Sequence, residues 1–371
     1  MSTKTTVILF LAIFAVGAFL IVGLPFLLKR DGGPAPPPPP NQTQPEGPAD
    51  RGFFRSDDGG KTWQQRVWVE GGGGTIAAVR VNRLIADPVR PERLFLATAD
   101  SGLWVSVSRG DLWARVEVEG GARLGPTTNV LALAVNRSDP SEWYVAIFQD
   151  RHGRLLRTGD DGKSFQEVYV TPVERFGVFD VHHDAGARTV DIVTGQGGLL
   201  RSSDEGRTWR LIRWFADGLT RLVVNPARPG IRFVSSPEGN VFRTLDGGQS
   251  WVDVTSALRS FSGAKEGQQW VVDRAGALYL GSAYGLLRSR DNARTFSPLP
   301  LIIPPDALPV LAIAVDHTNT NRLFVSAGSQ LYASRDGGES WEFLSSPGQG
   351  RIVQLFVDRE QSETIYAVVQ P

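Results

Sequence analysis

The stretch SDDGGKTW at Ser56–Trp63 decides the fold, because close copies of it return along the whole chain. Each copy has a Ser or Thr, an Asp two residues later, a Gly or Ala, a second Ser or Thr and a closing Trp or Phe. The good copies are Ser56–Trp63, Thr158–Phe165, Ser202–Trp209, Thr244–Trp251, Ser289–Phe296 and Ser334–Trp341. A degenerate copy, SVSRGDLW at Ser106–Trp113, has Ser108 in place of the Asp. The closing aromatics stand at 63, 113, 165, 209, 251, 296 and 341, and this period of 42 to 52 residues predicts a repeat protein.

Apolar segments of strand length flank the copies. GLLRS at Gly198–Ser202 precedes one closing turn, and WRLIR at Trp209–Arg213 follows it. Between copies lies a hairpin pattern, such as Leu131–Phe148, in which two apolar runs are separated by an Asn/Asp/Pro turn. Four strands per repeat are the content of a propeller blade.

Counting strands predicts how the ring closes. Phe53–Trp63 follows only a Pro-rich stretch, so it supplies the third and fourth strands of a blade. Arg351–Gln370 follows the last copy and has a hairpin pattern without a box. Joined, the two halves make one blade and leave no exposed sheet edge. We therefore expect an all-β, seven-bladed propeller over residues 52–371, closed by a composite blade from both ends.

The first residues predict a membrane anchor. Val7–Leu28 is uncharged and mostly apolar, and as a helix it would span about 33 Å, close to the hydrocarbon thickness of a bilayer. The run is longer than the apolar region of a cleaved signal peptide. We expect a signal-anchor transmembrane helix in residues 1–30 and a Pro-rich linker in residues 31–51. The propeller is then expected on the exported side, periplasmic or extracellular, because large domains translocate largely regardless of flanking charge.

Composition excludes several kinds of chemistry. The 39 basic and 39 acidic residues balance, which argues against a nucleic-acid partner. Cys is absent and only four His are present, which removes thiolate metal sites and Cys nucleophiles. His182 and His183 are adjacent on a predicted strand, so their side chains point to opposite faces. We expect no cofactor and no metal site.

The repeated turn resembles the Asp-box, or bacterial neuraminidase (BNR), repeat of sialidases, sortilin-type receptors, xyloglucan hydrolases and the photosystem II assembly and stability factors. In those families the box is a structural turn remote from the active face. The resemblance therefore implies a structural role for six carboxylates, which are Asp58, Asp160, Asp204, Asp246, Asp291 and Asp336. The physical basis is local: the Asp accepts backbone N–H groups, and the Gly takes a positive φ.

The blade number and the single propeller most resemble the photosystem II assembly factors. This implies a non-enzymatic protein-binding or assembly platform for a membrane protein or membrane-associated complex, without catalytic residues. The alternative is a cell-surface glycan-binding protein or a BNR-type exo-glycosidase, which needs two carboxylates roughly 5–10 Å apart. The sialidase Arg-Ile-Pro-type motif is missing, since Arg51 precedes Gly52 and Phe53. The partner-binding candidates lie in loops opposite the boxes, and they are Arg123, Arg151, Arg175, Arg259, Lys265, Asp150, Glu238 and Tyr284.

Overall fold

The computed structural model describes residues 51–118, 123–303 and 309–371, and these three ranges belong to one compact unit. The predicted anchor in residues 1–30 and all but the last residue of the predicted linker lie outside the described residues, so both stay predictions. In the described ranges, no helix is long and apolar enough to cross a membrane.

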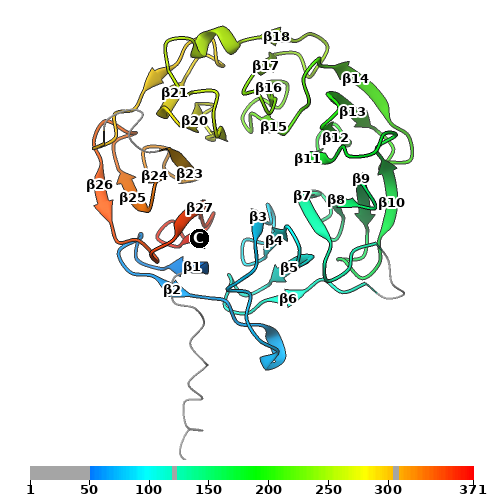
Figure 1. The fold of residues 1–371 in the computed structure, drawn as a ribbon, viewed down its shortest axis with the longest axis horizontal. Coiled ribbons are helices and arrows are strands. Elements are labelled where there is room, and N and C mark those ends of the chain that lie inside the picture. Colours follow the sequence, from blue (N-terminus) through cyan, green and yellow to red (C-terminus); the bar gives the residue numbers. More distant parts are fainter. Residues whose placement is uncertain (1–50, 119–122, 304–308) are drawn as a thin grey trace, which may run out of the picture. The chain divides into compact units, whose positions relative to one another are not determined.

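The propeller consists of seven four-stranded antiparallel sheets set around a central axis (Figure 1). Blade 1 contains β3 (Val81–Ala86), β4 (Leu94–Thr98), β5 (Leu103–Ser106) and β6 (Ala114–Arg115). Blade 2 contains β7 (Asn129–Val135), β8 (Trp143–Gln149), β9 (His152–Thr158) and β10 (Gln166–Val170). Blade 3 contains β11 (Val178–Asp184), β12 (Thr189–Thr194), β13 (Gly198–Ser202) and β14 (Arg210–Trp214).

The remaining blades follow the same order from the axis outward. Blade 4 contains β15 (Arg221–Val224), β16 (Arg232–Ser235), β17 (Val241–Thr244) and β18 (Val252–Asp253). Blade 5 contains β19 (Gln269–Val272), β20 (Leu278–Ser282), β21 (Gly285–Ser289) and β22 (Ser297–Pro298). Blade 6 contains β23 (Val310–Val315), β24 (Leu323–Ala327), β25 (Gln330–Ser334) and β26 (Glu342–Leu344). Two short 3₁₀ turns, η1 (Glu70–Gly72) and η2 (Thr255–Leu258), lie in loops between blades.

Blade 7 is built from both ends of the propeller, as predicted. Its inner strands are β27 (Arg351–Val357) and β28 (Ile365–Gln370), and its outer strands are β1 (Gly52–Ser56) and β2 (Gln64–Gln65). The strands β1 and β28 pair antiparallel along the whole of β1, from Gly52 opposite Val369 to Ser56 opposite Ile365. Backbone hydrogen bonds between β1 and β28 therefore close the ring, so neither of these strands is left as an exposed sheet edge.

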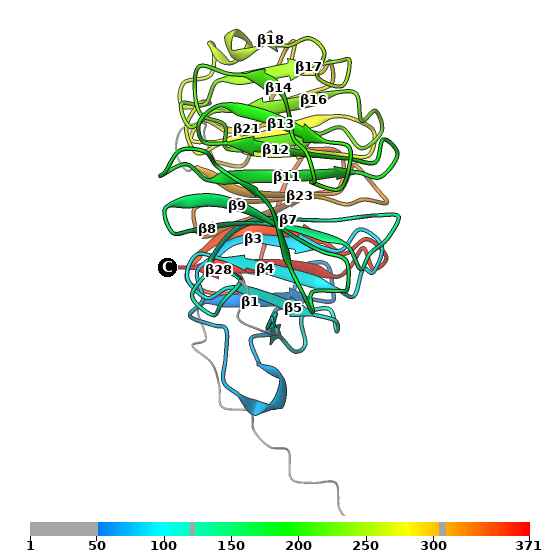
Figure 2. The same ribbon diagram turned by 90° about the vertical axis from the view of Figure 1, so that its right-hand side faces the viewer.

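The antiparallel order of the strands gives the ring two different ends. The boxes, which join the third and fourth strands, share one end with the turns between the first and second strands; we call this end the box side. The loops between blades and between the second and third strands lie at the other end, which we call the loop face. In Figure 2 the loop face is on the left, where the chain ends after β28.

Aromatic and aliphatic side chains fill the space between neighbouring blades. Phe95 of blade 1 meets Trp143 of blade 2 edge-on, with ring centroids 4.9 Å apart. The closing aromatic of a box also reaches its neighbour, since the indole of Trp209 donates to the carbonyl of Val168 in blade 2 at 2.8 Å. The box aromatic Trp209 thus packs between blades 2 and 3.

The six good boxes share one hydrogen-bond pattern. In the first, Thr62 donates its backbone N–H to Asp58 Oδ1 at 2.9 Å and its hydroxyl to Asp58 Oδ2 at 2.6 Å, while Ser56 donates its hydroxyl to Oδ1 at 2.8 Å. Hydrogen bonds from Thr62 are the main reason that the pKa of Asp58 falls to about 2. The same contacts recur at Asp160, Asp204, Asp246, Asp291 and Asp336.

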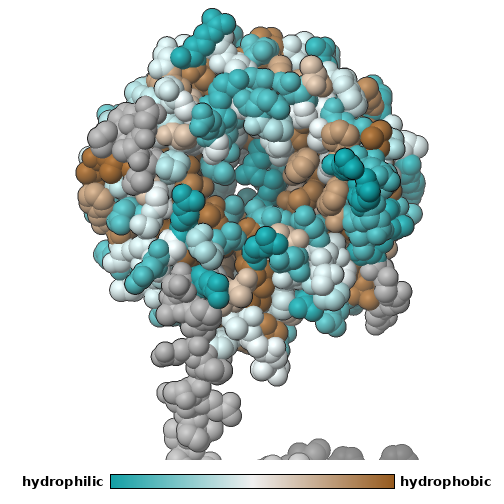
Figure 3. Space-filling model, in the orientation of Figure 1, coloured by the Kyte–Doolittle hydropathy of each residue, from teal (hydrophilic) through white to brown (hydrophobic). Residues whose placement is uncertain are grey.

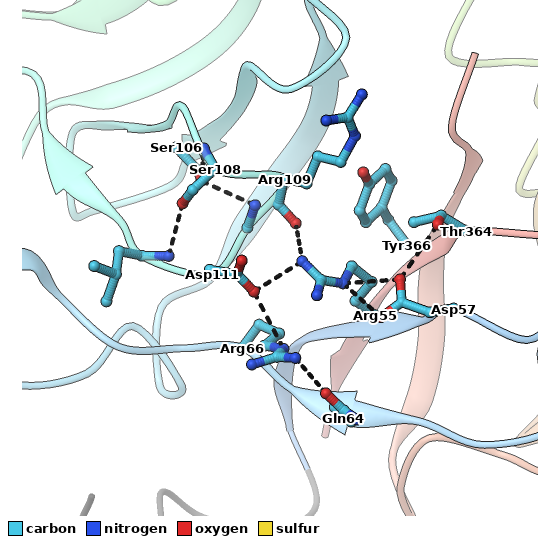
Figure 4. Close-up of polar contacts among 12 residues, drawn as sticks. Arg55, Asp57, Gln64, Arg66, Ser106, Ser108, Arg109, Asp111, Thr364 and Tyr366 are labelled. Carbon is cyan, nitrogen blue, oxygen red and sulfur yellow. Dashed lines mark hydrogen bonds and ion pairs between the residues drawn. The ribbon is translucent and has the colours of Figure 1, made fainter. Parts of the chain in front are cut away.

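The degenerate copy of the box, Ser106–Trp113, contributes contacts that help to close the ring. The hydroxyl of Ser108 replaces the missing carboxylate and accepts the backbone N–H of Leu112 at 3.2 Å. Asp111 points away from the turn and accepts from Arg55 of the composite blade at 2.8 Å, with Arg66 at 3.5 Å (Figure 4). The copy that departs most from the pattern thus holds blade 1 against blade 7.

A second repeated turn lies on the box side, at the end of each innermost strand. There an Asp or Asn begins the turn into the second strand, and its backbone N–H bonds back across the turn, as from Asp316 to the carbonyl of Arg322 at 3.0 Å. The side chain caps the same turn, since Asp316 Oδ1 accepts the N–H of Thr318 at 2.7 Å. The seven residues are Asp87, Asn136, Asp184, Asn225, Asp273, Asp316 and Asp358.

Candidate functional site

A cavity of about 340 Å³ opens at the loop-face mouth of the central channel. Figure 3 looks onto this face and shows it hollowed around the axis. Its lining residues are Asn82, Thr220, Arg221, Ser235, Ser236, Pro237, Lys265, Gly267, Gln268, Gln269 and Gln354. Two of these side chains are cationic, four are amides and none is acidic, so the cavity is polar and positively charged.

Bulges in the innermost strands help to place the amide side chains. Asn82 is an extra residue in β3, because Val81 and Arg83 oppose the adjacent residues Thr98 and Ala97 of β4. A bulge in β27 comes directly before Gln354. A bulge bends its strand and redirects the side chains at that point. Both amides thereby become part of the channel mouth instead of following the simple alternation of a strand.

Arg221 is the main charge of this cavity. Beside it, Arg83 Nη1 lies 2.6 Å from Asp180 Oδ1, and Asp180 Oδ2 accepts the backbone N–H of Leu222 at 3.1 Å. The guanidinium of Arg221 makes no hydrogen bond or ion pair with any described residue. The positive charge of Arg83 and, second, burial lower the pKa of Arg221 to about 10, against the opposing effect of Asp180. This guanidinium therefore lacks a counter-charge of its own.

Lys265 is held over the same cavity by the loop that follows η2. The side-chain amide of Gln268 donates to the carbonyls of Gly239 and Ala264, each at 3.1 Å. A Cβ atom at Gly239, whose φ is +75°, would lie 2.1 Å from the carbonyl oxygen of Lys265, so this close approach requires glycine. A second, larger cavity of about 710 Å³ lies beside the loop.

Two of the predicted residues contribute to these cavities. Lys265 lines both of them, and Arg259 lines the larger one. Tyr284 packs its ring edge-on against Phe261, with centroids 5.1 Å apart, and so belongs to the packing beneath the loop. Glu238 lies exposed in the loop between β16 and β17.

The other predicted residues gather in the loops of blades 2 and 3. Arg123 Nε lies 2.8 Å from Glu167, and its Nη1 lies 3.4 Å from Asp150. Arg151 lies 2.9 Å from Glu174, and its carbonyl accepts the N–H of Arg175 at 2.6 Å. Carboxylates thus pair with two of the predicted partner-binding arginines, Arg123 and Arg151. On the loop face, the cations that line the two cavities described above are on blade 4 and on the loop between blades 4 and 5.

The amide side chains and Arg221 were missed at the sequence level. A usable signal is a polar residue near the beginning of an otherwise apolar innermost strand, as in RLVV at Arg221–Val224 and QWVV at Gln269–Val272. In a propeller, that position is at the channel mouth.

The fold, the box geometry and the polar channel mouth define a seven-bladed Asp-box propeller with a candidate binding site on its loop face. The BNR/Asp-box repeat model matches residues 54–65. The model of the family described as photosynthesis system II assembly factor YCF48 matches residues 153–351, more than half of the chain. The chain belongs to this family.

Similar proteins fall into two groups. A probable oligoxyloglucan-reducing end-specific xyloglucanase of Neosartorya fischeri is 24% identical over 299 residues, which cover 61% of this chain and 36% of that protein. The GH74 xyloglucanase structure from Xanthomonas campestris has a TM-score of 0.63 at 18% identity, covering 82% of this chain and 52% of that one. The structure of YCF48 bound to D1 peptide has a TM-score of 0.58 at 16% identity, covering 78% and 97%.

The lengths of the matches differ between the two groups. This chain spans about a third of the curated xyloglucanase and about half of the xyloglucanase structure, whereas it matches nearly all of the YCF48 structure. At these identities, the two structural likenesses show the fold alone.

Proposed function

We propose that this protein is a non-enzymatic assembly or stability platform that holds a peptide segment of a membrane protein at the loop-face cavity. The observation that carries the proposal is a cavity lined by Arg221 and Lys265 together with amides and hydroxyls, but by no carboxylate. Membership of the YCF48 family supports it. The solved YCF48 complex with a D1 peptide shows that a relative with this fold binds a peptide.

The lining groups suit an acidic peptide. A guanidinium binds a carboxylate through two parallel N–H groups. Asp180, the described carboxylate that acts on Arg221, is already bonded to Arg83 and to the N–H of Leu222. The amides of Gln268, Gln269 and Gln354 offer both donors and acceptors to a peptide backbone. We therefore expect the recognised segment to place a side-chain or C-terminal carboxylate beside Arg221.

The predicted anchor and linker complete the proposal. A Pro-rich linker in residues 31–51 would hold the ring within tens of Å of the bilayer surface, on its exported side. Tethering raises the effective concentration of partners in the same membrane, so a modest intrinsic affinity would be enough.

The test uses the full chain and labelled acidic peptides, including a D1 peptide, each with a free or an amidated carboxyl end. We expect Arg221→Gln to weaken binding about tenfold or more, as for the loss of a charge-assisted hydrogen bond. Arg294→Gln, an equal charge change on the box side, is the matched control and should leave binding unchanged. Equal peptide affinities for the wild type and Arg221→Gln would contradict the proposal that the peptide binds at this cavity.

The xyloglucanase relatives favour glycoside hydrolysis as a second candidate function. The loop-face cavity has no lining carboxylate, but Asp253 and Glu266 both line the larger cavity beside it. A panel of aryl-glycosides and xyloglucan oligosaccharides tests this directly. We expect no turnover. Hydrolysis that disappears in Asp253→Asn or Glu266→Gln would overturn the platform and establish an enzyme.

A further inference from the structure

The box-side mouth of the central channel also carries positive charge, independently of the loop-face site. A cavity of about 310 Å³ lies there, and its lining includes Arg137, Arg274, His317 and Arg359. Each of these residues directly follows the Asp or Asn that begins the inner turn of its blade. The same position in the other three blades is occupied by Pro88, Ala185 and Pro226. A repeated position thus brings four basic residues to one opening, whose lining also includes Asp273 and Asp316.

The two carboxylates that line the cavity are already bonded to neighbouring groups. Asp273 Oδ1 accepts the N–H groups of Ala275 and Ala277, both at 2.9 Å, and Asp273 is 5% exposed. Asp316 caps its own turn in the same way and lies 3.6 Å from Arg322 on its other side. Both carboxylates therefore serve the turns beneath the opening.

The guanidinium groups have almost no partners of their own. Within the described ranges, Arg137 and Arg274 make no hydrogen bond or ion pair. Arg359 donates to the carbonyl of Pro88 at 3.5 Å. The guanidinium groups of Arg137, Arg274 and Arg359 can therefore bind an anion at this opening.

The three arginines lie close enough to His317 to disfavour its charged form. Burial and then the charges of Arg359, Arg274 and Arg137 lower the pKa of His317, and Asp316 opposes this shift. Arg137 follows the innermost strand of blade 2, and its charge contributes, after burial, to the lowered pKa values of His317 on blade 6 and Arg359 on blade 7, so it acts across the channel. An anion at the opening would relieve this repulsion.

The channel wall behind the opening is apolar. Val271, Ile313, Val315 and Phe356 line the cavity from the innermost strands of blades 5, 6 and 7. Val271, Val315 and Phe356 are only partly buried by the protein itself. A ligand that enters past the charged rim therefore meets hydrocarbon.

We propose that this opening binds a small organic anion whose carboxylate or phosphate contacts Arg137, Arg274 and Arg359 and whose apolar body enters the channel. The volume of about 310 Å³ suits such a molecule, since an apolar cavity of roughly 150 Å³ is enough for benzene. The site lies at the opposite end of the channel from the proposed peptide cavity, so the two inferences stand or fall separately.

Isothermal titration of the full chain with phenyl phosphate, inorganic phosphate and benzylamine tests the ligand chemistry. We expect phenyl phosphate to bind more tightly than inorganic phosphate, because only phenyl phosphate has a ring that can contact the apolar wall of the channel. Benzylamine has the same ring and the opposite charge, so we expect no measurable binding. Tighter binding of benzylamine than of phenyl phosphate would contradict the proposal.

Variants then locate the site. The double variant Arg274→Gln/Arg359→Gln should weaken phenyl phosphate binding at least tenfold, and His317→Glu, which changes an exposed residue, should weaken it as well. Arg294→Gln, on the same side of the ring, and Arg221→Gln, at the loop face, should leave the affinity unchanged. Loss of binding in Arg221→Gln with no loss in the double variant would place the anion at the loop face and overturn the proposal. Circular dichroism of each variant checks that the fold is retained.

Discussion

Two buried tyrosines allow a direct test of how the composite blade is stabilised. Tyr366 of β28 donates its hydroxyl to Asp358 Oδ2 at 2.7 Å, and Asp358 also pairs with Arg109 of blade 1 at 3.2 Å. Tyr332 of β25 is equally buried, but its hydroxyl has no partner among the described residues. Changing each tyrosine to phenylalanine removes the same atom from two different environments.

The expected magnitudes follow from these environments. Phe95, Phe233 and Phe324 occupy the position of Tyr366 in three other blades, so the ring of Tyr366→Phe fits without repacking. The variant loses one hydrogen bond to a buried carboxylate, which stabilises a protein by about 1.5–3 kcal/mol. Arg109 still pairs with the Asp358 carboxylate in this variant, so we expect the free energy of unfolding to fall by about 2 kcal/mol. Tyr332→Phe removes an unpaired buried hydroxyl, so we expect no loss and a small gain.

Urea unfolding followed by far-ultraviolet circular dichroism measures both variants against the wild type. The midpoint should fall for Tyr366→Phe and stay or rise for Tyr332→Phe, with the same denaturant dependence in all three proteins. Equal midpoints for the two variants would refute the reasoning, because they would show that the bond between Tyr366 and Asp358 contributes nothing to closure.

Three further predictions concern the ring and its turns. Deleting Arg351–Pro371 removes both inner strands of blade 7, so we expect insoluble or protease-sensitive protein, and an unchanged melting temperature would disprove the closure scheme. In the folded protein the pKa values of four box carboxylates are lowered to about 2, below roughly 4 for an unfolded Asp; the four are Asp58, Asp160, Asp204 and Asp291. The ionised carboxylates therefore stabilise the fold fully above roughly pH 4, and this stabilisation is lost as the pH falls toward about 2. Melting temperatures measured from pH 5 to pH 2 should therefore fall less steeply in Asp204→Asn than in the wild type. Asp246→Ala should lower the melting temperature through loss of the bonds from Ser250 but keep peptide affinity, and a loss of affinity at full stability would make the boxes functional.

The sequence by itself determined the architecture of the propeller. The boxes can be recognised because their chemistry is local: Ser56, Asp58 and Thr62 lie within seven residues and bond to one another. Strand counting then required Phe53–Trp63 and Arg351–Gln370 to share a blade, and β1 pairs with β28 accordingly. Each of the six box carboxylates accepts hydrogen bonds within its own turn, and a purely structural role for them stays a prediction.

Only the tertiary structure decided which charges face an opening. Arg123 and Arg151 were sound candidates by loop position, yet Glu167 and Glu174 pair with them. Arg221 was missed because its surroundings come from residues distant in sequence, such as Arg83 of blade 1 and Asp180 of blade 3. The physical reason is that local turns depend on neighbours along the chain, whereas the channel mouths depend on ring closure and on strand bulges. A bulge shifts the alternation of side chains by one residue, and the sequence pattern does not show where that shift occurs.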